Sequence, residues 1–410
     1  MADADERALA GLRVLDLSGA MGNYCGKLFA ELGADVILIE PPEGGDLRGQ
    51  PPYVDDLPGL ENSLKFFYNN TSKRGVCLDL EAEAGRDVLR TLAAKADLLI
   101  EDKPPGELAR LGLGAEDLLG VNPRLVVTSV TPFGQVGPYA QYEHSDLVCL
   151  ALGGLLWMGG YADGPPVMAA GEQAYVAGNL FAAVSSMVAL THAELHGEGQ
   201  WNDVSVQESV AMGLENAAQF YDLEGHIRRR FGGTQRQAGF GVYPSEDGDV
   251  FLLAGGIGGN RFWPNLVDWM DEDGVPDTDR FRGDEWGDTE FLTREDTMQL
   301  FWEVFTAFTA DKTRQALYHE SQRWRVPLCP LNRPSDVLES AQLQHRGFFV
   351  EVEAFDRTFK VPGAPYRLSE TPWRLDGPAP SLGEHTEEVL AEHGFGQSER
   401  DTLREQGVIK

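Results

Sequence analysis

The residue with the most chemical promise is Glu172, the one charged side chain in a run of small and apolar residues that spans positions 168–190. A carboxylate at the mouth of an apolar segment is poorly hydrated unless it is partnered, and poorly hydrated carboxylates are candidate catalytic groups. A structural use is also open, because Glu172 precedes what reads as a buried helix opening at Gly178, near the positive end of that helix's dipole.

Histidine and cysteine spacing gives no support for a metal centre. His192 and His196 lie four residues apart, on one face of a helix, but no third ligand accompanies them. The four cysteines are far apart in the sequence and form neither a CxxC pair nor a Cys/His ligand pattern. We therefore predict no metal site and no disulfide framework, which fits a reducing cytoplasm.

The composition excludes one class of partner. The chain has 410 residues, long enough for two or three domains, with 34 basic against 65 acidic residues and a formal net charge of -31. Binding of nucleic acid through a general basic field needs clustered Lys and Arg, so we predict no nucleic-acid partner. Specific anion pockets remain possible.

The acidic residues are spread along the chain, Lys is scarce beside Arg, and hydrophobic residues still make up 42 %. This resembles proteins of extreme halophiles, in which molar salt screens such self-repulsion over roughly 3 Å. The N-terminus, MADADER, is unlike a signal peptide, and we read no uninterrupted membrane span. We expect a soluble cytoplasmic protein that makes no membrane contact.

The N-terminal third alternates strand-like and helix-like blocks. Helix-like stretches of about ten residues, such as 24–32 and 83–96, separate the short apolar runs. The strand-like runs are 12–18, 34–40, 75–80, 96–102 and 124–130. This rhythm predicts a parallel, doubly wound sheet, an α/β fold. The first turn, SGAMGNYCG, lacks the GxGxxG fingerprint, so a standard nicotinamide site is not expected.

Later segments predict a second domain. From about position 143 the pattern is mainly helical, and residues 225–325, which include a long acidic loop, read as a smaller α+β domain. A proline-rich stretch then leads back to two terminal helices. We assign 1–224 and 326–410 to a large domain.

Successive phrases along almost the whole chain resemble the motifs of family III CoA-transferases, a superfamily that includes formyl-CoA transferase, carnitine CoA-transferase and 2-methylacyl-CoA racemases. The phrases are LRVLDLS, LFAELGADVILIEPPEGGDLR, NNTSKRGVCLDL, ADLLIEDKPPG, NPRLVVTSVTPFGQVGPY, SDLVCLALGGL, HGEGQWNDVSVQES, VPLCPLNRPSDVL, HRGFFVEVE and SLGEHTEEVLAEHGF. Their order is more specific than any one of them. The resemblance implies a Rossmann-like large domain that holds CoA, a smaller domain, and an interlocked homodimer.

The resemblance also implies a carboxylate nucleophile that attacks the acyl-CoA thioester, forms a mixed anhydride and then carries CoA as an enzyme thioester. The family uses an aspartate four residues before the glycine that here is Gly178, and this position is Ala174. We favour Glu172, the nearest carboxylate, as its replacement. Asp163 is a weaker substitute. Loss of the nucleophile, leaving a CoA-binding protein without transferase activity, is an alternative.

Matching positions imply the contacts to CoA, whose phosphates suit cations and backbone amides. Asp102 stands where an asparagine is more usual, and surface ion pairing is the alternative role of each cation. The implied CoA-binding residues are Met21, Gly22, Arg48, Lys73, Arg74, Asp102, Lys103 and Arg110.

Two further features concern the acyl group. Gly232, Gly233, Thr234 and Gln235 occupy the place of a glycine loop that closes over the acyl site in formyl-CoA transferase, although a plain linker would look similar. His144 stands one residue from the catalytic histidine of the racemase relatives, which makes a 2-methylacyl-CoA racemase or epimerase the second alternative.

The function that the resemblance implies is transfer of CoA between small carboxylic acids, with dicarboxylates favoured. Within the family, a chain of this pattern with a halophile-like composition looks most like the type that moves CoA from succinyl-CoA to mesaconate. Its partners would be an acyl-CoA and a free acid, with coenzyme A as a substrate and no tightly bound cofactor.

Overall fold

A computed structural model describes residues 7–230, 232, 235–256 and 260–410. The chain divides into two compact units, which are described separately below. The first unit consists of Met1–Leu156, Met168–Ile227 and Gln344–Lys410, and the second of Trp157–Val167 and Arg228–Leu343.

The first unit is built on a six-stranded sheet in which every neighbouring pair is parallel, with the order β3-β2-β1-β4-β5-β6. The strands are β1 (Arg13–Asp16), β2 (Asp35–Glu40), β3 (Arg74–Cys77), β4 (Leu98–Glu101), β5 (Val126–Thr131) and β6 (Trp201–Ser205). Most of their residues are buried, as expected for apolar runs covered on both faces. The predicted parallel sheet is confirmed. Its order reverses between β1 and β4, and ligands of such sheets bind beside the strands' carboxyl ends at that point.

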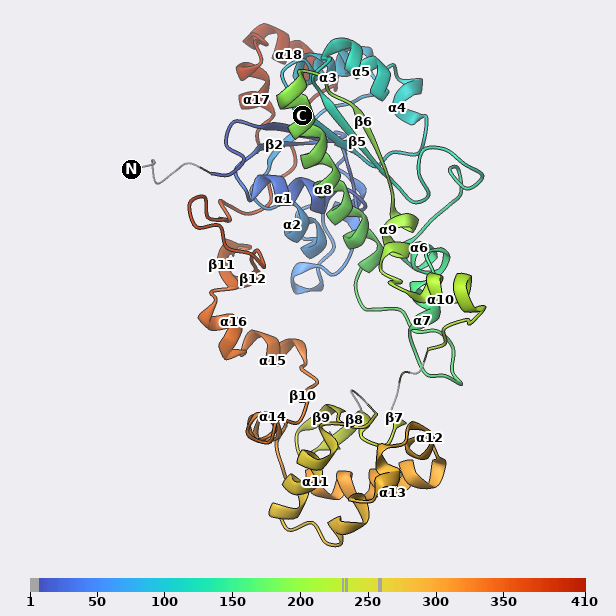
Figure 1. Ribbon diagram of the computed structural model, residues 1–410. Coiled ribbons are helices and arrows are strands. Elements are labelled where there is room, and N and C mark those ends of the chain that lie inside the picture. The colour runs from blue at the N-terminus through green and yellow to red at the C-terminus, as the bar shows by residue number, and fades with distance from the viewer. Residues whose placement is uncertain (1–6, 231, 233–234, 257–259) are drawn as a thin grey trace. The chain divides into compact units, whose positions relative to one another are not determined.

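Helices cover both faces of this sheet (Figure 1). One face packs against α1 (Asn23–Ala30), α6 (Asp146–Leu152), α8 (Gln173–His196) and α9 (Val206–Met212). The other face packs against α3 (Glu83–Ala93), α5 (Ala115–Val121), α17 (Thr386–Glu392) and α18 (Gln397–Glu405). The C-terminal tail therefore belongs to the core of the first unit. Its remaining elements include α2 (Leu64–Asn70), α4 (Glu107–Arg110), α10 (Ala217–Glu224) and the hairpin of β11 (Phe349–Ala354) and β12 (Arg357–Pro362).

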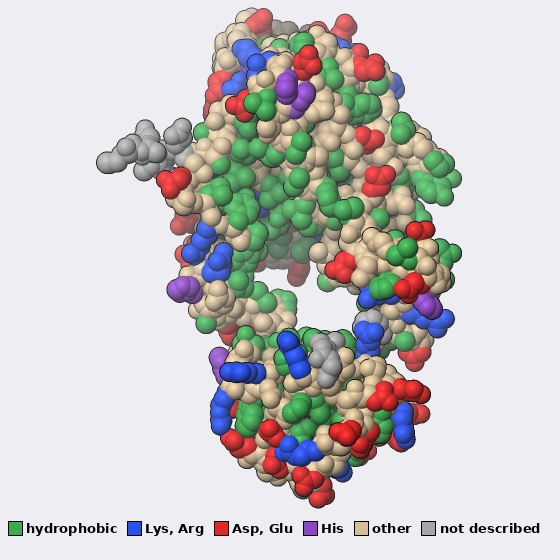
Figure 2. All heavy atoms as spheres, viewed as in Figure 1, with side chains coloured by type: hydrophobic (Ala, Val, Ile, Leu, Met, Phe, Trp, Pro, Cys, Tyr) green, Lys and Arg blue, Asp and Glu red, His purple; other side chains and the backbone are tan. Residues whose placement is uncertain are grey.

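The helix α8 is unusual in its composition. It is long and apolar enough to cross a membrane by length and composition, which the sequence analysis did not anticipate, and 44% of its most apolar window is buried within the structure. One side packs on β5 and β6. The other side leaves a stripe of apolar side chains exposed, formed by Leu180, Val184, Val188 and Leu195. Figure 2 shows hydrophobic side chains gathered over this part of the first unit.

The second unit is a smaller α+β fold, as predicted. Its antiparallel sheet has the order β10-β9-β8-β7, formed by β7 (Gln235–Gln237), β8 (Phe240–Ser245), β9 (Gly248–Leu253) and β10 (Leu328–Pro330). Aromatic rings from β8 and from α11 (Trp263–Glu272) and α13 (Glu295–Thr309) fill its core. Its further helices are α12 (Thr289–Leu292), α14 (Arg314–Trp324) and α15 (Pro334–Leu338). Along the chain, two boundaries between the units fall within α7 (Leu155–Met158) and α16 (Ala341–His345). The interlocked homodimer stays a prediction, because the structure is of one chain.

Candidate active site

A cleft of about 800 Å³ opens in the first unit where the sheet order reverses. Its walls are the loops that follow β1, β2 and β4, together with the first residues of α6 and α8. Of the residues predicted from the sequence, the cleft is lined by Met21, Asp102, Lys103, His144 and Glu172. The position agrees with the general rule for open α/β sheets.

Asp102 organises the turn after β1. Its Oδ2 accepts hydrogen bonds from the backbone amides of Gly19 (2.8 Å) and Met21 (3.1 Å). Burial raises the pKa of this carboxyl, against the lowering effect of Lys103 and the two amides. Gly22 begins α1 beside this turn, and a Cβ at that position would collide with the Cβ of Ser18. Asp102 and Gly22 therefore fix the turn after β1, and this turn forms one wall of the cleft.

The first residue of α6, Asp146, is a carboxylate at the N-terminus of α8 that the sequence reasoning missed. Asp146, which is 8% exposed, accepts hydrogen bonds through Oδ1 from the amides of Ala174 (2.8 Å) and Tyr175 (3.2 Å). Its Oδ2 is buried and has no hydrogen-bond partner among the described residues. Burial raises the pKa of Asp146. The signal in the sequence was an aspartate directly before an apolar run, but its contact lies 28 residues further along the chain.

Ala174, the position to which the resemblance assigned an aspartate, is fully buried. Glu172 occupies the N-cap position of α8, although its side chain makes no capping hydrogen bond to the described helix. Instead, Glu172 Oε1 pairs with Lys65 Nζ at 2.6 Å, with both side chains about one third exposed. The carboxylate thus reaches the cleft, and Lys65 fixes its position. Glu172 as nucleophile stays a prediction.

His144 lies near this carboxylate cluster. Its Nδ1 is 3.2 Å from the hydroxyl of Tyr175, and the two rings meet edge to face. Both residues line the cleft. The structure therefore places an imidazole and a phenol beside the first turn of α8.

Arg48 is buried inside the first unit and does not line the cleft. Its guanidinium is fully buried and makes two 2.8 Å hydrogen bonds to Glu40, one of 2.8 Å to Glu61 and one of 2.9 Å to the carbonyl of Pro380. It also stacks over the ring of Phe66 at 3.7 Å. These contacts hold the loop after β2 against the C-terminal tail.

Lys73 is likewise an internal residue. Its Nζ donates to Asp16 (2.7 Å), to the carbonyl of Asn23 (2.7 Å) and to the side chain of Asn70 (2.8 Å), and both members of the ion pair are fully buried. Burial lowers the pKa of Lys73, and Asp16 opposes this effect. The pair joins β1, α1 and α2 beneath the cleft.

Two further cations form ion pairs outside the cleft. Arg74 binds Asp35 at 2.8 Å and two glutamates of α17 at 3.0 Å. Arg110 pairs with Glu81 at 2.6 Å, both side chains being more than half exposed. Among the candidate cations in the described part of the chain, Lys103 is the one that lines the cleft.

The predicted closing loop belongs to the second unit. The amide of Gly232 donates to the carbonyl of Gly160 at 2.9 Å. Gln235 starts β7, where its side chain accepts from the hydroxyl of Tyr243 (3.0 Å). Gly233 and Thr234 lie outside the described residues. A role of this segment over the acyl group stays a prediction.

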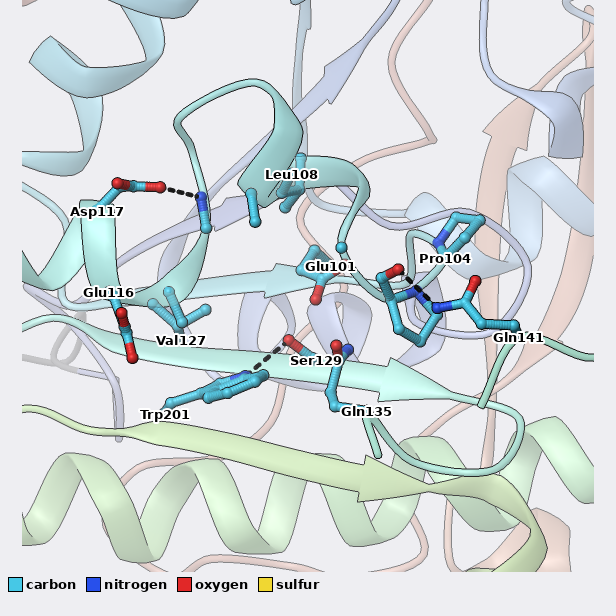
Figure 3. A pocket seen from close by; sticks show the side chains of 15 residues that line it. Glu101, Pro104, Leu108, Glu116, Asp117, Val127, Ser129, Gln135, Gln141 and Trp201 are labelled. Atoms are coloured by element: carbon cyan, nitrogen blue, oxygen red, sulfur yellow. Dashed lines mark hydrogen bonds between the residues drawn. The ribbon is translucent and has the colours of Figure 1, made fainter. Parts of the chain in front are cut away.

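A separate cavity of about 490 Å³ lies beside β4, β5 and β6, and Figure 3 shows Glu101 and Ser129 pointing into it. The indole of Trp201 donates to the hydroxyl of Ser129 at 3.0 Å. Burial raises the pKa of Glu101 to about 7, although Ser129 and the amide of Lys103 bind its charged form. Within the described residues, no three His, Cys, Asp or Glu side chains form a cluster fit for a metal ion.

Comparison with known proteins agrees with this architecture. Residues 9–386 match CoA-transferase family III, and the chain belongs to that family. It is accordingly a CoA-transferase, and coenzyme A is the group that it carries between acids. One relative is the succinyl-CoA:(R)-benzylsuccinate CoA-transferase subunit BbsE of Thauera aromatica, 44% identical over 97% of each chain.

More distant relatives have other acceptors. The succinyl-CoA:mesaconate CoA-transferase of Haloarcula hispanica is 29% identical and covers 95% of this chain and 97% of its own. A crystal structure of a CAIB/BAIF family protein from Brucella suis superposes with a TM-score of 0.83 at 26% identity, covering 95% of this chain and all of the other. The family assignment made from the motifs is confirmed.

Proposed function

We propose that this chain moves CoA from succinyl-CoA to a succinic acid that bears an aromatic substituent, of the benzylsuccinate kind. The observation that carries the proposal is the 44% identity, over nearly the full length, to a subunit named for this acceptor. The relative named for mesaconate, the acceptor that the family resemblance favoured, is 29% identical. The carboxylate cluster at the start of α8 supports a reaction that proceeds through acyl transfer to an acidic side chain.

Glu172 is the carboxylate that we propose as nucleophile. Its oxygen attacks the thioester carbonyl of succinyl-CoA, a C–O bond forms, the C–S bond breaks, and CoA leaves as a thiolate. The thiolate then attacks the glutamyl carbonyl of the mixed anhydride, which forms an enzyme thioester and releases succinate.

The acceptor carboxylate repeats these steps in reverse. It attacks the glutamyl thioester and displaces the CoA thiolate, leaving a mixed anhydride between Glu172 and the acceptor. The thiolate attacks the acceptor's acyl carbon, which yields the new acyl-CoA and regenerates the free carboxylate. The exchange consumes no water and no net proton. Because water would hydrolyse the mixed anhydride, exclusion of water from the site protects this intermediate.

Trapping tests this assignment. The full chain is incubated with succinyl-CoA, treated with hydroxylamine, and digested for mass spectrometry, which should find the hydroxamate on Glu172. Glu172→Gln should remove the trapped adduct and lower the exchange rate by roughly 10⁴-fold or more. Glu43→Gln, at an exposed position, is the matched control and should behave as the unaltered chain. Normal turnover of Glu172→Gln would exclude Glu172 from the mechanism.

Three observations support a second candidate source of the nucleophile, a partner chain. Position 174 holds a buried alanine, α8 exposes an apolar stripe suited to another chain, and the benzylsuccinate relative is named a subunit. The nucleophile would then come from a partner chain, and the exposed stripe would form the interface, whether with a second copy or with a related chain. A hydroxamate found on a co-purifying chain, with none on Glu172, would establish this alternative.

A further inference from the structure

A second cavity adjoins the cleft on the other side of Glu172. It has a volume of about 560 Å³ and lies between α1, α2 and the first turns of α8. Ala20, Gly171, Glu172 and Tyr175 line both spaces. The two spaces therefore meet at the carboxylate that we propose to react.

The lining of this second cavity is mainly apolar and aromatic. Pro52, Leu64 and Val176 contribute aliphatic surface, and the rings of Tyr24 and Tyr68 stack with centroids 6.1 Å apart and an interplanar angle of 15°. Such surfaces suit a planar apolar group, since aromatic pairs favour offset or edge contacts at these distances. The volume lies within the range of small-molecule sites.

Lys65 supplies a positive charge where the two spaces meet. Its Nζ lies 2.6 Å from Glu172 Oε1 and 3.5 Å from the Gln50 side-chain oxygen, and its side chain is 33% exposed. An ammonium group has three donors, so it can bind a second carboxylate while it holds the first. A carboxylate entering this space from the cleft side would meet Lys65.

We propose that this second cavity receives the apolar substituent of the acceptor acid, and that Lys65 binds the carboxylate that does not become the thioester. The inference rests on the proposed function and specifies its substrate class, a dicarboxylic acid with a bulky apolar or aryl side chain. Tyr24 and Tyr68 contact the substituent. Val176, one turn beyond Glu172, sets the space available to it.

Filling the cavity tests the first part. Val176→Phe should lower kcat/KM for benzylsuccinate relative to methylsuccinate at least tenfold, because a hydrophobic pocket discriminates by roughly 10- to 200-fold per lost group. Val121→Phe makes the same exchange at the end of α5, remote from both cavities, and should leave the ratio unchanged. Calorimetric CoA binding verifies that each variant is folded. An unchanged ratio in folded Val176→Phe overturns the proposal.

Removing the charge tests the second part. Lys65→Gln should lower kcat/KM for benzylsuccinate at least tenfold more than that for 3-phenylpropanoate, which keeps the aryl chain and lacks the second carboxylate. The loss common to both acids reports the hold of Lys65 on Glu172. Lys65→Arg should restore most of the difference, since a guanidinium also binds carboxylates. Equal losses for both acids would show that Lys65 acts only through Glu172, and would overturn its role in binding.

Failure of the proposed function has a separate signature. If the unaltered chain exchanges CoA with none of these acids, calorimetry with free benzylsuccinate still decides about the cavity. Binding that Val176→Phe weakens at least tenfold supports the subsite. Absence of binding, or equal binding by both proteins, rejects it.

Discussion

For Lys73, the family resemblance and the geometry imply different roles, and one substitution can distinguish them. The resemblance makes it a ligand of the CoA phosphates, whereas the structure buries its ammonium completely against Asp16. We expect Lys73→Met to destabilise the first unit and to leave CoA affinity almost unchanged in the folded fraction. Lys103→Met, at the cleft, should leave the stability of the first unit almost unchanged and weaken CoA binding.

The magnitude follows from what Lys73→Met leaves behind. Asp16 would remain fully buried without its counter-ion, with Ser18 as its remaining hydrogen-bond partner among the described residues. Breaking a buried ion pair from one side costs about 3–5 kcal/mol. Neutralising the partner as well, in Lys73→Met with Asp16→Asn, should recover most of this loss, since the unpaired charge is its main cause.

Hydrogen exchange by mass spectrometry is the appropriate assay, because a chain with two units need not unfold in one step. Amides of β1 and β3 should exchange with an opening free energy lower by about 3–5 kcal/mol in Lys73→Met. Calorimetry with CoA, on the same samples, gives the affinity. If protection of β1 stayed within about 0.5 kcal/mol while CoA affinity fell tenfold or more, Lys73 would be a phosphate ligand and our geometric reasoning would be refuted.

Three further predictions follow from the same structure. Because burial raises the pKa of Glu101 from an ordinary value of 4.5 to about 7, the unfolded chain loses this proton first, and stability should fall as pH rises from 4.5 to 7 by up to about 3 kcal/mol. Glu101→Gln should remove this slope in urea melts, and a slope equal to that of the unaltered chain would contradict the assignment. Gly22→Ala should cost about 1–3 kcal/mol and weaken CoA binding, since its Cβ would displace Ser18; unchanged melting and calorimetry would count against a close turn. With a net charge of -31, the chain should lose circular dichroism as KCl falls below molar levels, and a signal that stays flat to about 0.1 M would contradict the expected salt requirement.

The sheet was predictable because its signal is local. Runs such as those at β1, β2 and β4 are apolar over their own length. The helical segments between them are too long for hairpin turns and have the length of the crossover connections that join parallel strands. Parallel pairing follows from these two features. The second unit was predictable in class for similar reasons, since its elements are consecutive in the chain.

The roles of the charged residues could not be predicted in the same way. Lys73 finds Asp16 at a separation of 57 residues, and Asp146 meets Ala174 at 28, so neither partner is visible from the residue's own neighbourhood. A lysine that faces phosphate and one that is buried against a carboxylate look alike in sequence. Composition does not distinguish the two roles either, because with 65 acidic and 34 basic residues any lysine has many carboxylates with which it could pair.

The charges at the start of α8 connect the two proposals. In the described structure, Asp146 accepts from the amides of the first turn, whereas Glu172 is held through its ion pair with Lys65. On the two proposals, a dicarboxylic acyl group that places its free carboxylate on Lys65 shares that ammonium with Glu172, which weakens its hold on Glu172 without breaking it. We expect the less tightly held Glu172 oxygen to attack the acyl carbon more readily. Because a monocarboxylic acyl group cannot share the ammonium in this way, we expect the same lysine to favour dicarboxylates both in binding and in the chemical step.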